Sequence, residues 1–189
     1  MAQLTFGKHM QGKAFRVEVG FVAPPRVTLA PEEEGQNPPV GALVCGEPLM
    51  IETDVLGFAA GTDVEFRICE PNRLHESPVD TLTAQTTDED RGVSVDWTFN
   101  WDDHKGSVHV ARFVCIAQVD TLVAISEPFW IYDRFETTLQ DGDGAPLAHA
   151  RVRLRAAGLE DVVAEADDEG KVEVLVPPGD YLLELLDEG

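Results

Sequence analysis

The sequence predicts an all-β protein with two consecutive antiparallel β-sandwich modules behind an N-terminal arm. Three observations lead to this fold class. Apolar and polar residues alternate with a period of two in many short runs, as in half-buried strands. The 16 glycines and 12 prolines divide the chain into short segments. The length of 189 residues is enough for two small sandwiches. We place the arm at residues 1–38 and the modules at residues 39–132 and 133–189.

The arm combines one predicted strand with a proline-rich linker. Phe15, Val17, Val19 and Phe21 alternate with polar residues or glycine, which predicts a half-buried strand. The residues after it are broken by prolines at positions 24, 25, 31, 38 and 39, so we expect a linker there. Charge supports the boundary. Residues 1–38 carry four basic and four acidic side chains, whereas residues 39–132 carry five and sixteen, and residues 133–189 carry five and fifteen.

The first module shows the clearest strand pattern, at residues 93–101, where Val, Val, Trp, Phe and Trp alternate with polar residues. Further strands are expected at residues 49–55, 64–68, 108–119 and 129–132. Short strands separated by turn residues predict an immunoglobulin-like sandwich. The antibody spacing of Cys, Trp and Cys is missing, so the prediction covers the architecture alone.

The second module is predicted to have strands at residues 135–140, 150–156, 161–166, 171–176 and 181–186. Two hairpin turns, Asp141-Gly142-Asp143-Gly144 and Asp167-Asp168-Glu169-Gly170, and the run Val176-Pro177-Pro178-Gly179-Asp180-Tyr181 punctuate them. Gly144 and Gly170 are expected at positive φ. With these motifs the segment resembles the carboxypeptidase regulatory-like, transthyretin-like sandwich family. The resemblance implies about seven strands, and five are visible. Either the module is short, or the chain is truncated, or a partner completes an edge.

A wider resemblance concerns the order of the modules. An immunoglobulin-like segment followed by a transthyretin-like one, in an acidic chain, resembles accessory proteins of type VI secretion and phage-tail-like contractile injection machines. That resemblance implies a bacterial adaptor that links cargo or effector proteins to a spike, made in the cytoplasm and exported with the apparatus.

Charge and cysteine content limit the partners and the compartment. The net charge of −21 disfavours nucleic acids and anionic membranes, because both attract cations. It indicates a solvated surface, or else a partner with a basic face. Three cysteines fit poorly with a disulfide scaffold, and Cys69 and Cys115 fall within strand patterns as small buried residues. With no apolar signal segment near the start, we expect cytoplasmic synthesis.

Candidate catalytic and metal-binding motifs are weak. Trp101-Asp102-Asp103-His104, with His109 nearby, could bind a cation or transfer protons, but we favour a polar turn after a strand. Asp141–Gly144 lacks the later acidic ligand of a calcium loop. No strained nucleophile turn, phosphate loop or zinc spacing is visible. We therefore expect a non-enzymatic protein without cofactor or metal. The alternatives are a carbohydrate- or cell-wall-binding module and, with Asp103 and His104, a hydrolase.

Three surfaces are predicted to bind a protein partner. Trp130 and Tyr132 lie where the two modules meet. Arg151, Arg153 and Arg155 form a cationic stripe in an acidic module. The last strand presents Tyr181, Leu183 and Leu185 on one face at an edge. The alternative for these residues is an interdomain core and a solvated face.

Overall fold

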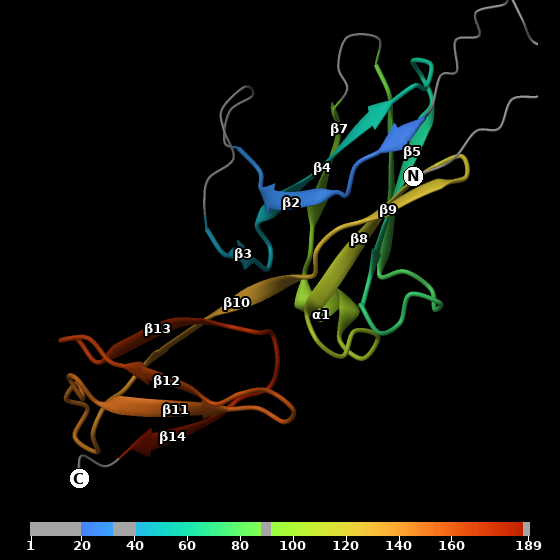
Figure 1. The fold of residues 1–189 in the computed structure, drawn as a ribbon. Coiled ribbons are helices and arrows are strands. Elements are labelled where there is room, and N and C mark those ends of the chain that lie inside the picture. Colours follow the sequence, from blue (N-terminus) through green and yellow to red (C-terminus); the bar gives the residue numbers. More distant parts are fainter. Residues whose placement is uncertain (1–19, 32–40, 88–91, 187–189) are drawn as a thin grey trace, which may run out of the picture.

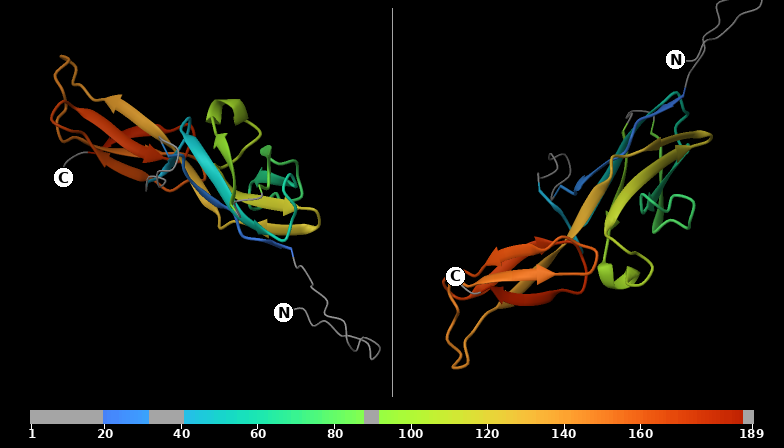
Figure 2. Two further views of the ribbon diagram at one scale, coloured as in Figure 1. Left: turned by 90° about the horizontal axis from the view of Figure 1, so that it is seen from above. Right: turned by 60° about the horizontal axis from the view of Figure 1, so that its bottom comes forward.

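The computed structural model describes residues 20–31, 41–87 and 92–186. These residues form fourteen strands and one short helix, which confirms the all-β fold class. Two sandwich-like units lie end to end, with the C-terminal unit below the first in Figure 1 and joined to it by strand β10. Figure 2 shows the same arrangement from two other sides. None of the helical segments in the described ranges is long and apolar enough to cross a membrane.

One sheet of the first module is built around β4 (Pro48–Leu56). β4 pairs with β7 (Gly92–Thr98) and with two short strands, β1 (Phe21–Val22) and β2 (Arg26–Leu29). Both short strands come from the predicted arm, so residues 21–29 are part of the sandwich and the linker prediction is wrong there. Short strands at a sheet edge tolerate flanking prolines, which explains the misleading pattern. Residues 15–19 and the expected boundary at residue 38 lie outside the described ranges.

The facing sheet joins seven strands of both modules. β5 (Asp63–Cys69) and β8 (Arg112–Val119) lie at its centre and pair with each other. β6 (Asp80–Gln85) pairs with β5, and β9 (Leu122–Ile125) pairs with β8. β3 (Leu43–Val44) runs parallel to β10 (Phe129–Thr138), whereas the other strand pairings of the described residues are antiparallel, as predicted.

The core of the first module is an aromatic cluster between the two sheets. Five of the six ring pairs among Trp97, Phe99, Phe113 and Phe129 have centroids 5.0 to 6.4 Å apart, and all five are tilted or edge-to-face, the geometry favoured by aromatic pairs. The indole N–H of Trp97 donates to Asp80 Oδ2 over 3.1 Å, so its polar atom is satisfied. β7 ends at Thr98, before the predicted residue 101, because α1 (Trp101–His104) turns the chain there. β8 likewise begins at Arg112 and not at residue 108.

Strand β10 belongs to both modules. Phe129 and Trp130 pair with β8, whereas Asp133–Thr138 pair with β13 (Lys171–Val176). The expected boundary between residues 132 and 133 therefore falls inside a continuous strand. No glycine or proline occurs between positions 129 and 138, so nothing in this stretch interrupts the strand.

The second module has the five predicted strands. β10 and β13 face a sheet of β12 (Val162–Glu165), β11 (Arg151–Arg155) and β14 (Leu182–Leu186), in that order. Its core contains the buried side chains of Val152, Leu154, Ala166, Val172 and Val176.

Both predicted hairpin turns of this module are confirmed. Gly144 and Gly170 have φ values of 85° and 75°. In each turn an aspartate side chain, that of Asp141 or Asp167, accepts two backbone N–H groups. These aspartates therefore serve as turn caps, a use that agrees with the hairpin interpretation.

Candidate functional site

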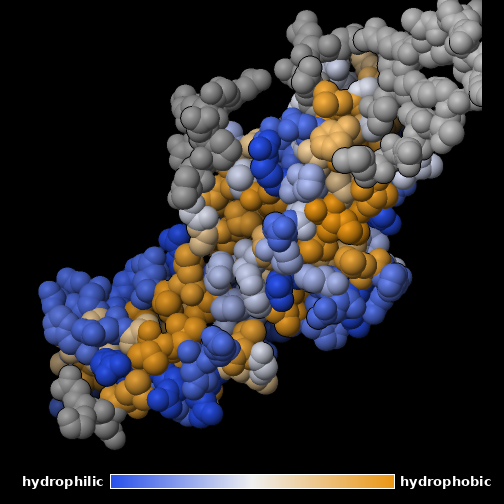
Figure 3. All heavy atoms as spheres, in the orientation of Figure 1, coloured by the Kyte–Doolittle hydropathy of each residue, from blue (hydrophilic) through white to orange (hydrophobic). Residues whose placement is uncertain are grey.

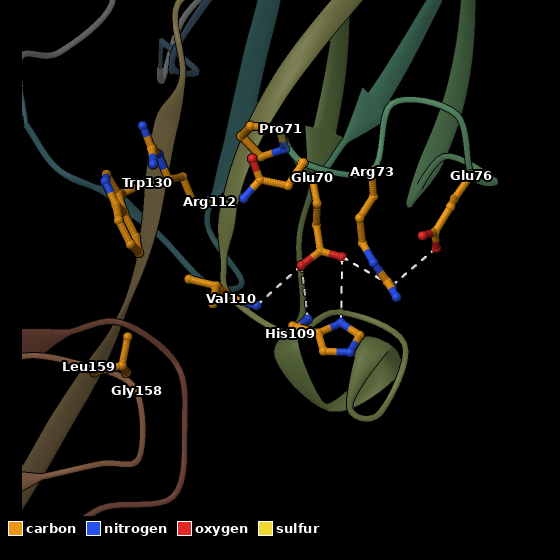
Figure 4. A pocket seen from close by; sticks show the side chains of 11 residues that line it. Glu70, Pro71, Arg73, Glu76, His109, Val110, Arg112, Trp130, Gly158 and Leu159 are labelled. Carbon is orange, nitrogen blue, oxygen red and sulfur yellow. Dashed lines mark hydrogen bonds and ion pairs between the residues drawn. The ribbon is translucent and has the colours of Figure 1, made fainter.

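A groove of about 490 Å³ lies where the two modules meet. The first module supplies the loop after β5, the segment before β8 and the start of β10; the second supplies the loop between β11 and β12. In Figure 4, Trp130 and Arg112 stand on one side, Glu70, Arg73 and His109 on the other, and Leu159 closes the groove from the second module. Because both modules line it, the groove depends on how β10 joins them.

Glu70 organises one wall of the groove. Its side chain is only 11 % exposed, and Oε1 accepts the backbone N–H of His109 at 3.0 Å and of Val110 at 3.3 Å. Its other oxygen pairs with Arg73 at 3.6 Å and with His109 Nδ1 at 3.7 Å. Arg73 also pairs with Glu76 at 3.3 Å. The buried carboxylate is therefore fully engaged in fixing two loops, as a buried charge must be.

Arg112 and Trp130 form the opposite wall. They are paired residues on neighbouring strands β8 and β10, and the guanidinium carbon lies 5.7 Å from the indole centroid. This is cation–π distance, and the stacking holds the guanidinium in place. Arg112 is exposed and forms no ion pair with any residue of the described ranges. It therefore offers free donors to a ligand, beside the apolar side chains of Val110 and Leu159.

The groove continues into a smaller hollow of about 260 Å³ along the junction. Trp101 lines it from the first module, and Pro178 and Asp180 line it from the second. Across the same junction Lys105 Nζ lies 3.4 Å from Asp180 Oδ1. The hydroxyl of Tyr181 donates to the carbonyl of Pro177 at 2.7 Å, which holds the loop before β14. An elongated hollow thus runs along the module junction.

Burial perturbs two side chains near this junction. Burial first, and the Asp133 carboxylate second, raise the pKa of the half-buried Cys45 thiol to about 11. The same two causes, burial first, raise the pKa of Tyr181. Both groups therefore stay protonated at neutral pH, so Cys45 is a poor nucleophile there.

The structure separates the residues predicted to bind a partner. Trp130 lines the groove, and Tyr132 and Tyr181 are half-buried elsewhere at the junction. The arginine stripe faces outward on β11, where Arg153 and Arg155 each pair with Asp161 and Glu184. On β14, Leu183 packs against the core, whereas Leu185 is 53 % exposed. The predicted partner-binding residues thus lie at the module junction, on the outer face of β11 and on β14, and the groove takes in only one of them, Trp130.

The candidate chemical motifs have structural roles. Trp101–His104 form the helical turn α1, and the His104 ring stacks on Phe99 with centroids 5.1 Å apart. Among residues 20–31, 41–87 and 92–186, no group of three His, Cys, Asp or Glu side chains is placed to hold a metal ion. Trp97 is buried and offers no open aromatic platform, whereas Trp101 is half-buried and lines the smaller hollow.

Four polar residues of the groove, Glu70, Arg73, Arg112 and Glu76, were not identified from the sequence. They lie in turns or at a strand end among other charged residues, and only the tertiary fold brings them together. The pairing of a basic residue with Trp130 across two strands would have been the one usable signal.

The sequence matches no protein-family model, and no curated protein matches it.

Proposed function

We propose that the chain is a non-enzymatic adaptor that binds a protein partner in the groove between its modules. The observation that carries this proposal is the pairing of an exposed, unneutralised Arg112 with the Trp130 ring, beside Val110 and Leu159. Arginine and tryptophan are the residues that most often dominate protein interfaces. A groove with one fixed cation and an apolar wall suits a peptide segment with a carboxylate next to an apolar side chain.

The state of the polar groups supports binding over chemistry. Glu70 is held by two backbone N–H groups and two side chains, so it is not free to take a proton from a substrate. His109 lies beside Glu70, and its side chain is 63 % exposed. None of the residues that line the groove carries a hydroxyl or thiol that His109 could activate as a nucleophile. These contacts rigidify the wall, and a rigid wall lowers the entropic cost of docking a partner.

The setting that we propose is a contractile injection machine, with the adaptor linking cargo or effector to the spike. The support is the order of the two modules and the transthyretin-like motifs of residues 141–181. Two rigid units joined through one strand, β10, would hold a bound partner at a fixed distance from a second attachment point.

A carbohydrate or cell-wall ligand is the alternative, since Trp130 is half-buried and lines the groove. Arg112 already lies over this ring, however, and a sugar would have to displace it. Saturable binding to a glycan array that Trp130→Ala abolishes would favour this alternative.

The test is quantitative affinity purification of the tagged chain from its source cells at low salt. Wild type is compared with Arg112→Glu and with Arg151→Glu, an equal charge reversal at an exposed position that does not line the groove. We expect the recovered partner to fall at least about tenfold for Arg112→Glu, since breaking a charge pair costs roughly 2 kcal/mol. Arg151→Glu should match wild type.

Two results would count against the groove. Recovery of the same stoichiometric partner by Arg112→Glu would show that binding does not use this cation. Loss with Arg151→Glu alone would assign binding to the arginine stripe instead.

A further inference from the structure

Strand β14 has an open edge. It pairs with β11 on one side, and no described strand pairs with its other side. At the opposite edge of this sheet, β12 contacts β13 of the facing sheet, so that side of the sandwich is closed. The backbone N–H and C=O groups along the outer side of Leu182–Leu186 are therefore available for another strand.

This edge exposes a leucine on each face of the sheet. Leu182 and Leu185 point to opposite faces of the sheet, and they are 62 % and 53 % exposed. Figure 3 shows hydrophobic atoms at the surface where β14 lies, next to the C-terminal end. The other open edge of the module, Asp133–Thr138 of β10, is guarded by Asp133, Arg134 and Glu136. Charges discourage strand addition and leucines do not, so β14 is the edge open to pairing.

The sequence of β14 is a palindrome, Leu-Leu-Glu-Leu-Leu, centred on Glu184. Two copies placed antiparallel about Glu184 would therefore present identical partners to each other. Leu182 would lie opposite Leu186 of the second copy on the outer face, and Leu183 opposite Leu185 on the inner face. Both exposed leucines would be covered in this register.

The charge at the centre of this register is already compensated. Glu184 lies 3.1 Å from Arg155 and 3.9 Å from Arg153 on the neighbouring strand. Two facing Glu184 side chains would thus have four arginines beside them, which offsets the repulsion that like charges suffer when directly opposed. The remaining repulsion between the two copies comes from the net charge of −21 on each chain, and salt screens this repulsion.

We propose that two copies of this chain associate through β14, forming one continuous six-stranded sheet from two three-stranded sheets. The inference goes beyond the proposed adaptor function, and its failure would leave the groove untouched. The dimer would be a bivalent molecule with two junction grooves. A five-residue strand buries little area, so the dimer is weak, with a dissociation constant of about 10 to 100 μM.

The first test is sedimentation velocity of the purified full chain over a wide concentration range. We expect a reversible dimer that strengthens with added salt. The double variant Leu182→Asn and Leu185→Asn should raise the dissociation constant at least about tenfold, because it removes two apolar contacts from each copy. The control is Val163→Asn on β12, an equally exposed apolar residue at the closed side, which should leave the dimer unchanged.

The second test fixes the register by disulfide formation, in a Cys45→Ser background. Glu184→Cys places identical cysteines opposite each other and should give a covalent dimer under mild oxidation. Leu182→Cys is the matched control. In the palindromic register its two copies are offset by four residues, roughly 13 Å, which is beyond disulfide reach. A monomer at all concentrations, a dimer that survives the double asparagine variant, or equal cross-linking at both positions would overturn the proposal.

Discussion

Gly170 offers the sharpest test of how the second module is closed. Its φ of 75° is in the left-handed region, and a Cβ built there would lie 2.6 Å from the carbonyl oxygen of Leu139. Gly144 makes the equivalent turn at φ 85°, but a Cβ there would meet nothing within 4 Å. The two glycines therefore share the backbone requirement and differ in the space around them.

The expected costs follow from this difference. Gly144→Ala should lower the free energy of unfolding by about 1 to 2 kcal/mol, the usual cost of a left-handed alanine. Gly170→Ala bears the same cost and must also displace backbone, which adds about 1 to 3 kcal/mol. The carbonyl of Gly170 also accepts the N–H of Leu139 at 2.8 Å, so any shift weakens the link between β10 and β13.

Urea unfolding followed by far-UV circular dichroism measures both variants against wild type. We expect Gly170→Ala to be less stable than Gly144→Ala by at least about 1 kcal/mol, with similar m-values. Equal destabilisation of the two variants would refute the argument from close packing around Gly170.

Three further predictions concern the thiols and the shared strand. Burial raises the pKa of all three cysteines, to about 11 for Cys45 and about 12 for Cys115. At pH 8 a thiol reagent should therefore modify the native chain slowly, whereas it should modify all three cysteines of the urea-unfolded chain quickly. Between pH 9 and 12 the buried thiols of the folded chain keep protons that the unfolded chain loses, so the free energy of unfolding should fall as the pH rises. Cys115→Ala should make this fall with pH less steep. An unchanged dependence on pH would contradict the argument from burial. All three tryptophans lie in the first module, so their fluorescence reports on that module, whereas circular dichroism reports on both modules. Because the modules share β10, we expect fluorescence and circular dichroism to change at the same urea concentration. Separate transitions would show that the modules unfold independently.

Local patterning was enough to predict the strands that bury one face. β5, β7, β11 and β13 alternate clearly, and each lies within two or three residues of its predicted position. The two turn glycines were also predictable, because tight turns require a conformation that other residues rarely adopt.

Features that depend on tertiary pairing were not predictable. β1 and β3 have two residues each, too few for any periodicity, and they form only because β4 and β10 provide edges. The continuity of β10 does not follow from the module motifs, because a change of module is expected to coincide with a break in the strand. The groove has the same origin: Glu70 and His109 are 39 residues apart, and they meet only when β5 and β8 pair.

Site-specific photo-cross-linking tests the central claim, that a protein partner occupies the junction groove, most directly. A benzophenone amino acid replaces Leu159 in the groove or, as control, Thr83 on the exposed face of β6, and the chain is irradiated in its source cells. We expect one discrete protein adduct from position 159, lost when Arg112→Glu is added, and none from position 83. Adducts from position 83 with none from position 159 would contradict it.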